Sequence, residues 1–308
     1  MKPYLDFSEY LKAAFPMTKV QKISINAGLS CPNRDGIDGL KGGCTYCNNR
    51  SFSPAYTLRG DSVRQQVEDG IAFFRRKYAA MKFIAYFQSY TNTYGERDRL
   101  ITLYEEALRN PEVVGLFVGT RPDCISDELL DYFASLQSRC RVFLEYGVES
   151  TQNATLERVR RGHTFEVSAD AVRRTSERGI PCGVHLIIGL PGETEEDFLL
   201  HIRRINRLPV TSLKMHHLQI LRGTALGRDY LAAPPEERMK VFGLDEYIRT
   251  AVLLLRHLRP DIYVDRFTAQ SPGELLLEPV WNLKNYLFTE KLIAYMEENG
   301  FRQGDLTS

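Results

Sequence analysis

Short apolar runs recur along the chain at fairly regular intervals. Most of them are continuously apolar and rich in β-branched and aromatic residues, which is the pattern of strands buried on both faces of a parallel sheet. The runs are Lys22–Ile25, Lys82–Phe87, Val113–Gly119, Arg141–Gly147, Cys182–Ile188, Ser212–Leu218 and Asp261–Val264. They predict that the core of the protein contains a parallel sheet.

The segments between these runs have the spacing of amphipathic helices. From residue 61 to residue 77, Val63, Val67 and Ile71 fall on one helical face, with charged residues off that face. The other predicted helices are Arg97–Arg109, Asp127–Leu136, Phe165–Arg178, Glu195–Asn206 and Asp245–Leu258. Thr194 and Asp197 resemble a capping box at the start of one of them. Most successive strands are separated by about 30 residues, the length of a βαβ unit.

About six strand–helix units with right-handed crossovers form either a doubly wound sheet or a partly or fully closed barrel. Ligands bind at the carboxyl ends of the strands in both architectures, and the unusual polar residues of this sequence mostly follow a predicted strand. We therefore expect an α/β fold, a partial (β/α)6 TIM-like barrel with N- and C-terminal helical extensions. No Gly-rich or Ser-rich linker divides the chain, so we expect one domain over residues 1–308, with a core at about 19–230 and a C-terminal extension at about 231–308.

The composition is that of an ordinary globular protein. With 40 basic and 39 acidic residues the formal net charge is +1, and 43% of the residues are hydrophobic. These values exclude a disordered or strongly polyanion-binding chain. No apolar run reaches the roughly 18 residues that span a bilayer, and Met1–Asp6 lacks the apolar segment of a signal peptide. We therefore expect a cytoplasmic protein that does not bind membranes.

Three of the six cysteines lie close together in the cysteine loop (residues 31–47), which follows the first predicted strand. Cys31, Cys44 and Cys47 have the spacing C-x12-C-x2-C, and such clusters in cytosolic proteins usually serve metal or redox chemistry. A structural zinc ion needs four ligands, and neither a second C-x2-C nor an H-x3-5-H pair follows. Three thiolates better suit a [4Fe–4S] cluster with one iron open to an exogenous ligand. A zinc-stabilised module and unconnected buried thiols remain the alternatives.

The cysteine loop and the repeated strand–helix units resemble the radical S-adenosylmethionine (SAM) superfamily over about residues 19–281. The first cysteine gap is longer than the commonest one in that superfamily. It is similar to the gap in the catalytic subunit of elongator and in the YhcC/YtqA-type proteins. The similarity to the latter type is strongest at residues 31–36 (Cys-Pro-Asn-Arg-Asp-Gly), 119–124 (Gly-Thr-Arg-Pro-Asp-Cys) and 161–163 (Arg-Gly-His).

This resemblance implies two cofactors and a site. Cys31, Cys44 and Cys47 would be the catalytic centre and bind three irons of a [4Fe–4S] cluster, whereas SAM would bind the fourth iron. In the superfamily, reduction of the cluster cleaves SAM to methionine and a 5′-deoxyadenosyl radical, which abstracts hydrogen from a substrate. A reductant such as flavodoxin or ferredoxin would then be a partner. By the same resemblance the SAM contacts would be Tyr46, Gln88, Ser89, Glu149, Arg161, His185, Ile188, Leu218 and Gln219.

Several other polar residues have two interpretations. Arg121 is either an anion-binding group at the barrel mouth or half of a structural pair with a neighbouring aspartate. Cys124 is either a hydrogen donor or a small buried side chain. Lys214, His216 and His217 alternate in direction along a strand, so one or two of them face the barrel interior.

The substrate is the open question. Similarity to elongator implies a radical SAM enzyme that acts on a wobble uridine of tRNA. The near-zero net charge, however, gives no sign of the excess of basic residues that is typical of nucleic-acid-binding proteins. The alternative is a haem- or metal-binding delivery protein on the same fold. Its candidate ligands are His163, His185, His216 and His217.

Overall fold

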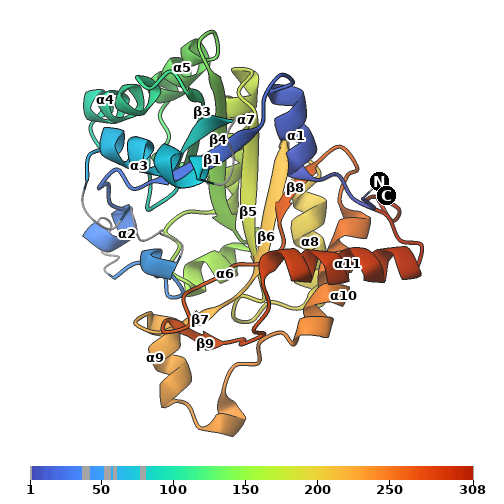
Figure 1. The fold of residues 1–308 in the computed structure, drawn as a ribbon. Coiled ribbons are helices and arrows are strands. Elements are labelled where there is room, and N and C mark those ends of the chain that lie inside the picture. Colours follow the sequence, from blue (N-terminus) through green and yellow to red (C-terminus); the bar gives the residue numbers. More distant parts are fainter. Residues whose placement is uncertain (1, 37–41, 52–56, 58–60, 77–80, 308) are drawn as a thin grey trace.

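The structure is a computed structural model that describes residues 2–36, 42–51, 57, 61–76 and 81–307. Its main feature is a seven-stranded parallel sheet with the strand order β1-β2-β3-β4-β5-β6-β8 (Figure 1). The strands are β1 Val20–Ile25, β2 Lys82–Phe87, β3 Val113–Thr120, β4 Arg141–Glu149, β5 Cys182–Ile188, β6 Ser212–His217 and β8 Tyr263–Arg266. Each strand coincides closely with an expected apolar run. The α/β fold and its curled, partial-barrel sheet are confirmed.

Several helices connect successive strands of the sheet and lie on its outer side (Figure 1). The helices are α1 Phe7–Ala14, α2 Pro32–Asp35, α3 Val63–Arg75, α4 Arg97–Leu108, α5 Asp127–Leu136, α6 Asn153–Arg158, α7 Phe165–Glu177, α8 Glu195–Ile205, α9 Ala225–Ala232, α10 Leu244–His257 and α11 Asn285–Glu298. The expected capping box starts α8: the Thr194 hydroxyl accepts from the Asp197 backbone, and the Asp197 carboxylate accepts from the Thr194 backbone.

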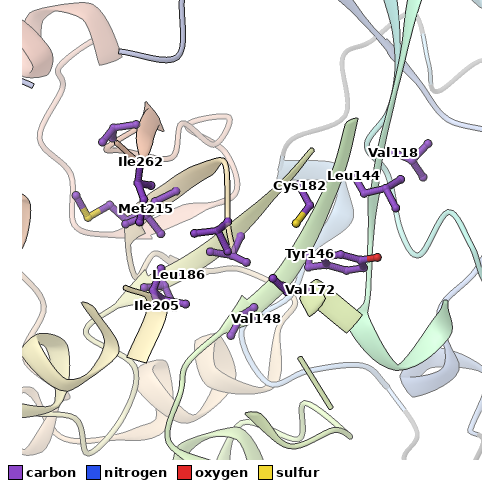
Figure 2. Close-up of a cluster of buried hydrophobic side chains, with 14 of the residues drawn as sticks. Val118, Leu144, Tyr146, Val148, Val172, Cys182, Leu186, Ile205, Met215 and Ile262 are labelled. Carbon is purple, nitrogen blue, oxygen red and sulfur yellow. The ribbon is translucent and has the colours of Figure 1, made fainter. Parts of the chain in front are cut away.

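The main hydrophobic core lies between the sheet and these outer helices. Leu144, Leu186 and Met215 come from three neighbouring strands and pack in one cluster with Val172 of α7 and Ile205 of α8 (Figure 2). All five side chains are fully buried. Burial of such a side chain contributes about 1.5–3 kcal/mol, so this cluster holds the helices against the sheet.

The N-terminal helix α1 closes the amino end of the partial barrel. Phe7 packs against Phe117 and Phe143 inside the barrel, with ring centroids 6.4 and 5.3 Å apart. Asp6 forms an isolated backbone bridge with Val264 of β8. Because this apolar plug fills the amino end, the carboxyl ends of the strands remain for a binding site.

The last strand of the main sheet lies in the C-terminal part of the chain. β8 follows residue 230, overlaps the expected run Asp261–Val264 and pairs with β6. A two-stranded antiparallel ribbon of β7 (Ile220–Leu221) and β9 (Leu276–Glu278) was not predicted, because such short strands have too little pattern to recognise. Among the described residues, no helix is long and apolar enough to cross a membrane.

Candidate active site

A cavity lies at the carboxyl ends of the strands, between the cysteine loop and the strand ends. Its wall includes most of the residues that were expected to bind the cofactors. They are Cys31, Cys44, Tyr46, Cys47, Gln88, Glu149, Arg161, His185, Leu218 and Gln219. These positions are far apart in the sequence, so only the fold brings them to one place.

Ile188 and Ser89 do not line this cavity. Alternate residues of a strand point to opposite faces, and in β5 the residues that face the cavity are His185 and Ile187. Ile188 packs instead in the main core between the sheet and the helices. Ser89 is buried outside the lining. The apolar part of the wall therefore includes Ile187 together with Leu218 and Leu221.

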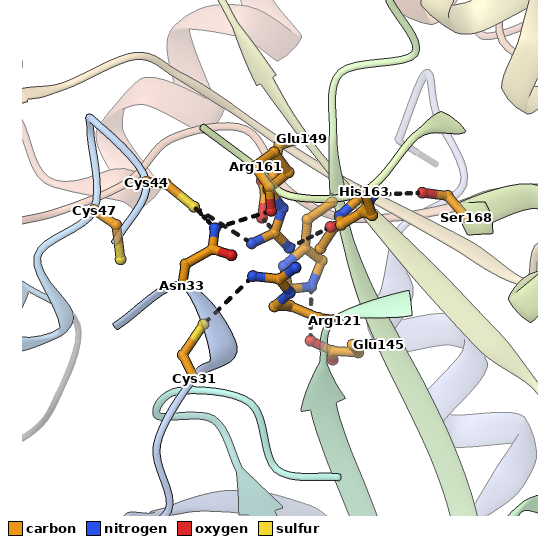
Figure 3. A network of polar contacts seen from close by, with 12 residues as sticks. Cys31, Asn33, Cys44, Cys47, Arg121, Glu145, Glu149, Arg161, His163 and Ser168 are labelled. Atoms are coloured by element: carbon orange, nitrogen blue, oxygen red, sulfur yellow. Dashed lines mark hydrogen bonds and ion pairs between the residues drawn. The ribbon is translucent and has the colours of Figure 1, made fainter. Parts of the chain in front are cut away.

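Hydrogen-bond donors and cations stand beside the cysteine sulfurs (Figure 3). The Nδ2 of Asn33 lies 3.3 Å from the Sγ of Cys44, and the Nη1 of Arg161 lies 3.8 Å from the same sulfur. On the other side, the Nη1 of Arg121 is 3.7 Å from the Sγ of Cys31. Two guanidinium groups beside the sulfurs favour a negatively charged group at this position.

The backbone around the first cysteine is anchored to a distant loop. Cys31 is the N-cap of α2, and Gly36 ends this helix with a φ of 80°, a conformation that favours glycine. Inside α2, the Nδ2 of Asn33 also donates to the carbonyl oxygens of Arg160 and Arg161, at 2.7 and 2.9 Å. One amide group therefore fixes the cysteine loop to the segment that follows α6.

The three sulfurs suit a cluster better than a single ion. Among the described residues, no three His, Cys, Asp or Glu side chains stand close enough to hold one metal ion. In a cluster each thiolate binds a different iron, so its sulfurs stand farther apart than the ligands of one ion. Three thiols on one cavity wall, with donors and cations beside them, fit an iron–sulfur cluster.

Arg161 joins the cysteine loop to the end of β4. Its Nη2 donates to the carbonyl oxygen of Gly147 at 2.5 Å and lies 3.6 Å from the Oε1 of Glu149. Within the described residues, its Nε and the hydroxyl of Tyr46 are buried without a hydrogen-bond partner. Leaving such a group unsatisfied costs about 1–3 kcal/mol, so both atoms fit a ligand that supplies the missing hydrogen bonds.

Arg121 forms the structural pair with Asp123. Its Nε and Nη2 bind the two carboxylate oxygens at 2.9 and 2.7 Å, and the guanidinium is buried. The remaining Nη1 is the nitrogen that lies beside Cys31 (Figure 3). The structure therefore shows the structural pair, in which Asp123 fixes the guanidinium next to a sulfur.

Six titratable side chains form a buried layer across the barrel interior, and the sequence did not predict them as a unit. This ionic layer consists of Lys22, Tyr86, Glu145, His185, Lys214 and Asp265. Glu145 is at its centre, because its Oε2 lies 2.6 Å from the Lys214 Nζ and 2.6 Å from the Tyr86 hydroxyl. The His185 Nε2 is 2.9 Å from the same oxygen. Tyr86, Glu145, His185 and Lys214 also line the cavity.

The ionic layer also connects the two edge strands of the sheet, β1 and β8. Lys22 on β1 lies 3.3 Å from Asp265 on β8, and Lys214 lies 3.2 Å from the same carboxylate. Burial alone would raise the pKa of Glu145, but Lys214 and Lys22 hold it well below its usual range. The layer therefore contains two positive and two negative charges and bridges the open side of the partial barrel.

The other three cysteines lie away from the cavity wall. Cys182 is fully buried in the main core, and Cys140 packs against the same core. Burial raises the pKa of Cys124 and of Cys182 to about 12, so both remain protonated thiols at neutral pH.

The four histidines considered as haem ligands do not meet at one place. His185 and His216 line the cavity. His217 stacks on Trp281, with ring centroids 4.1 Å apart, and lines a different pocket. His163 lines neither pocket, and burial lowers its pKa to about 3. This arrangement does not favour a haem-delivery function.

Comparison with known proteins defines the class. The family model of the radical SAM superfamily matches residues 37–205, and the model of the radical SAM C-terminal domain matches residues 210–298. The chain therefore belongs to the radical SAM superfamily and is an enzyme of that class. Its cofactors are SAM and a [4Fe–4S] cluster.

Individual relatives agree with this class. The chain is 34% identical to protein YhcC of Escherichia coli K12, over 92% of this chain and 89% of that protein. It is 30% identical to YtqA of Bacillus subtilis, over 93% of this chain and 87% of that protein. A solved structure of truncated Elp3 from Methanocaldococcus infernus has the same fold, with a TM-score of 0.68 and 19% sequence identity. The match covers 93% of this chain and 64% of the Elp3 chain. The expected resemblance to the YhcC/YtqA type is confirmed.

Proposed function

We propose that this protein cleaves SAM reductively and abstracts hydrogen from a substrate, with Cys31, Cys44 and Cys47 as the ligands of the cluster. When bound, the cluster and SAM supply the 5′-deoxyadenosyl radical for this chemistry. The main support is that three free thiols share one cavity wall in a chain of the radical SAM superfamily. The donors and cations beside the sulfurs suit the negative charge that three thiolates bring.

The residues around the cysteines supply binding and electrostatics. We assign Arg161 to the SAM carboxylate, because its guanidinium is buried in the cavity wall and is oriented by Gly147 and Glu149. Glu149 provides acceptors for the ammonium or the ribose hydroxyls of SAM. The unpartnered hydroxyl of Tyr46 is a further contact. Arg121 remains beside Cys31 and stabilises negative charge there.

The remaining residues of the cavity wall would make apolar and polar contacts with SAM. Ile187 and Leu218 offer an apolar surface for adenine. Gln88 accepts from the Ser24 hydroxyl at 3.2 Å and keeps its amide N–H donors for a ligand. The side chain of Gln219 is hydrogen-bonded at both ends to the loop after β8. We therefore propose that Gln219 contacts SAM through its backbone.

For the substrate we propose a wobble uridine of tRNA, and for the electron donor a flavodoxin- or ferredoxin-type protein. The tRNA proposal rests on residues 120–123 (Thr-Arg-Pro-Asp) and the long first cysteine gap, both of which resemble elongator. The net charge of only +1 means that tRNA binding would depend on local basic groups. A base would have to leave its stack to enter a cavity of this kind.

Anaerobic reconstitution tests the radical chemistry. The full chain is treated with iron and sulfide, then with SAM and dithionite, and 5′-deoxyadenosine is quantified. We expect a brown protein that forms deoxyadenosine, and the loss of both in Cys44→Ala. Cys140→Ala, which removes a thiol outside the cavity, is the matched control and should behave like the wild type. A wild-type chain with neither cluster nor deoxyadenosine refutes the proposal.

The substrate is tested separately. Modified tRNA nucleosides are compared in cells with and without the gene, and the proposal expects one modified uridine to disappear or to be replaced by a precursor. An identical nucleoside profile refutes the tRNA proposal and leaves the radical chemistry unaffected.

A further inference from the structure

Most cations of the cavity wall are paired with carboxylates. Arg121 and Arg161 each have a carboxylate oxygen within 3.6 Å, and Lys214 contacts two carboxylates. Such pairing is expected, because a cation taken out of water is stable only when its charge is compensated. Two further arginines, Arg34 and Arg266, line the same cavity.

These two arginines have different surroundings. Arg34 is exposed at the cavity rim, where its guanidinium lies 5.4 Å from the centre of the Tyr90 ring. Arg266 is partly buried, and its side chain has neither an ion pair nor a hydrogen bond with any of the described residues. The adjacent carboxylate, Asp265, is already bound to two lysines of the ionic layer. The guanidinium of Arg266 lowers the pKa of Asp265 through space, yet it is a cavity cation without a direct ion pair among the described residues.

A neutral histidine lies in the same part of the cavity. The Nδ1 of His216 is 3.0 Å from the backbone carbonyl of His217, so in the neutral ring Nδ1 carries the hydrogen and Nε2 is left as an acceptor. Burial lowers the pKa of His216 to about 4, and the charge of Arg266 acts in the same direction. His216 thus adds an acceptor near a cation that has no direct ion pair among the described residues.

We propose that Arg266 and His216 form a subsite for an anionic group of the substrate, a carboxylate or a phosphate. The guanidinium can bind two oxygens of either group at once, and the Nε2 of His216 can accept from a neighbouring hydroxyl or amine. Arg266 ends β8, at the sheet edge opposite to β1, from which the cysteine loop departs. This inference rests on the proposed function, because it names the class of substrate for the same cavity.

The subsite is distinct from the proposed position of the SAM carboxylate, which is Arg161. It therefore has to be tested with SAM already present. Inorganic phosphate and acetate are titrated by calorimetry into the reconstituted, SAM-saturated full chain and into Arg266→Gln and Arg266→Lys. Arg173→Gln, the same change on the exposed surface of α7, is the matched control.

We expect saturable anion binding that is weakened at least tenfold in Arg266→Gln, partly retained in Arg266→Lys and unchanged in Arg173→Gln. Tighter binding of phosphate would indicate a phosphate-bearing substrate such as tRNA. Tighter binding of acetate would indicate a carboxylic acid and would contradict the tRNA proposal. Equal affinity in the wild type and Arg266→Gln overturns the inference, as does the absence of saturable binding in the wild type.

The same titration without cluster and SAM separates this inference from the proposed function. A chain that forms no cluster but shows Arg266-dependent anion binding contradicts the proposed function alone. A chain that forms deoxyadenosine but shows no Arg266-dependent binding contradicts the anion subsite alone.

Discussion

Glu145→Gln should destabilise the protein, because it removes one of the two negative charges of the ionic layer and keeps the shape of the side chain. The two lysines of the layer would then share a single carboxylate. Lys22 and Lys214 lie 3.3 and 3.2 Å from Asp265, so neither would lose all of its pairing. The variant would nevertheless leave one buried positive charge uncompensated.

The expected loss can be estimated from this geometry. Removing one partner of a buried ion pair typically costs about 3–5 kcal/mol. Asp265 still contacts both lysines, and glutamine keeps an oxygen acceptor for the Tyr86 hydroxyl. We therefore expect the lower end, about 3 kcal/mol, which is a large share of the 5–15 kcal/mol that stabilises a typical native protein.

Urea unfolding of the full chain, followed by far-UV circular dichroism, measures this loss. Glu290→Gln makes the same chemical change on the exposed surface of α11 and should leave the unfolding midpoint unchanged. If Glu145→Gln has the wild-type free energy of unfolding, the ionic layer does not hold the edge strands together.

The pH dependence gives a second test of the same residue. The pKa of Glu145 is lower in the folded protein than in the unfolded chain, so its contribution is complete above the unfolded pKa of about 4.3 and disappears as the pH falls through the folded value. The difference in stability between the wild type and Glu145→Gln should therefore be largest near neutral pH and shrink below about pH 4. A difference that is constant down to pH 3 would contradict the ion pairing.

Two further variants test the SAM assignments. In Gly147→Ala the new Cβ would lie 2.5 Å from the Oε1 of Glu149 and 2.7 Å from the Nη2 of Arg161, so both side chains would have to move. Calorimetry of the reconstituted chain should therefore show SAM binding that is at least tenfold weaker. Unchanged affinity would count against Arg161 as the ligand of the SAM carboxylate. Tyr46→Phe removes a buried hydroxyl that has no partner among the described residues. The SAM-free chain should therefore be equally stable in urea or more stable by about 1 kcal/mol, with weaker SAM binding, whereas a clear loss of stability would mean that the hydroxyl already has a partner.

The strands could be located from the sequence because both faces of the sheet are covered. Burial on both faces leaves continuous apolar runs, and these runs marked every strand of the main sheet. Because these runs are continuously apolar, they do not show which of their residues face the cavity. Ile187 and Ile188 are both buried, and only the registration of β5 in the barrel directs Ile187 to the cavity and Ile188 to the outer core.

The cysteine loop could be recognised because the spacing of its three cysteines is local in the sequence, and all three line one cavity. The ionic layer could not, although Lys22, Glu145 and Asp265 each interrupt an apolar strand. Their pairing depends on the strand order and on the curl of the sheet, which brings β1 near β8. Neither property can be recognised from the local pattern of apolar and polar residues. Charged residues at inward-facing positions of apolar strands were the available signal.

The most direct test of the central claim is electron paramagnetic resonance of the reduced, reconstituted protein with and without SAM. We predict an iron–sulfur signal that changes when SAM is added, because in the proposed site SAM would bind the iron that Cys31, Cys44 and Cys47 leave open. The signal should disappear in each single alanine variant of these cysteines and persist in Cys140→Ala. A signal that SAM does not change, or that survives the loss of all three loop cysteines, would contradict the assignment of this cavity as the radical SAM site.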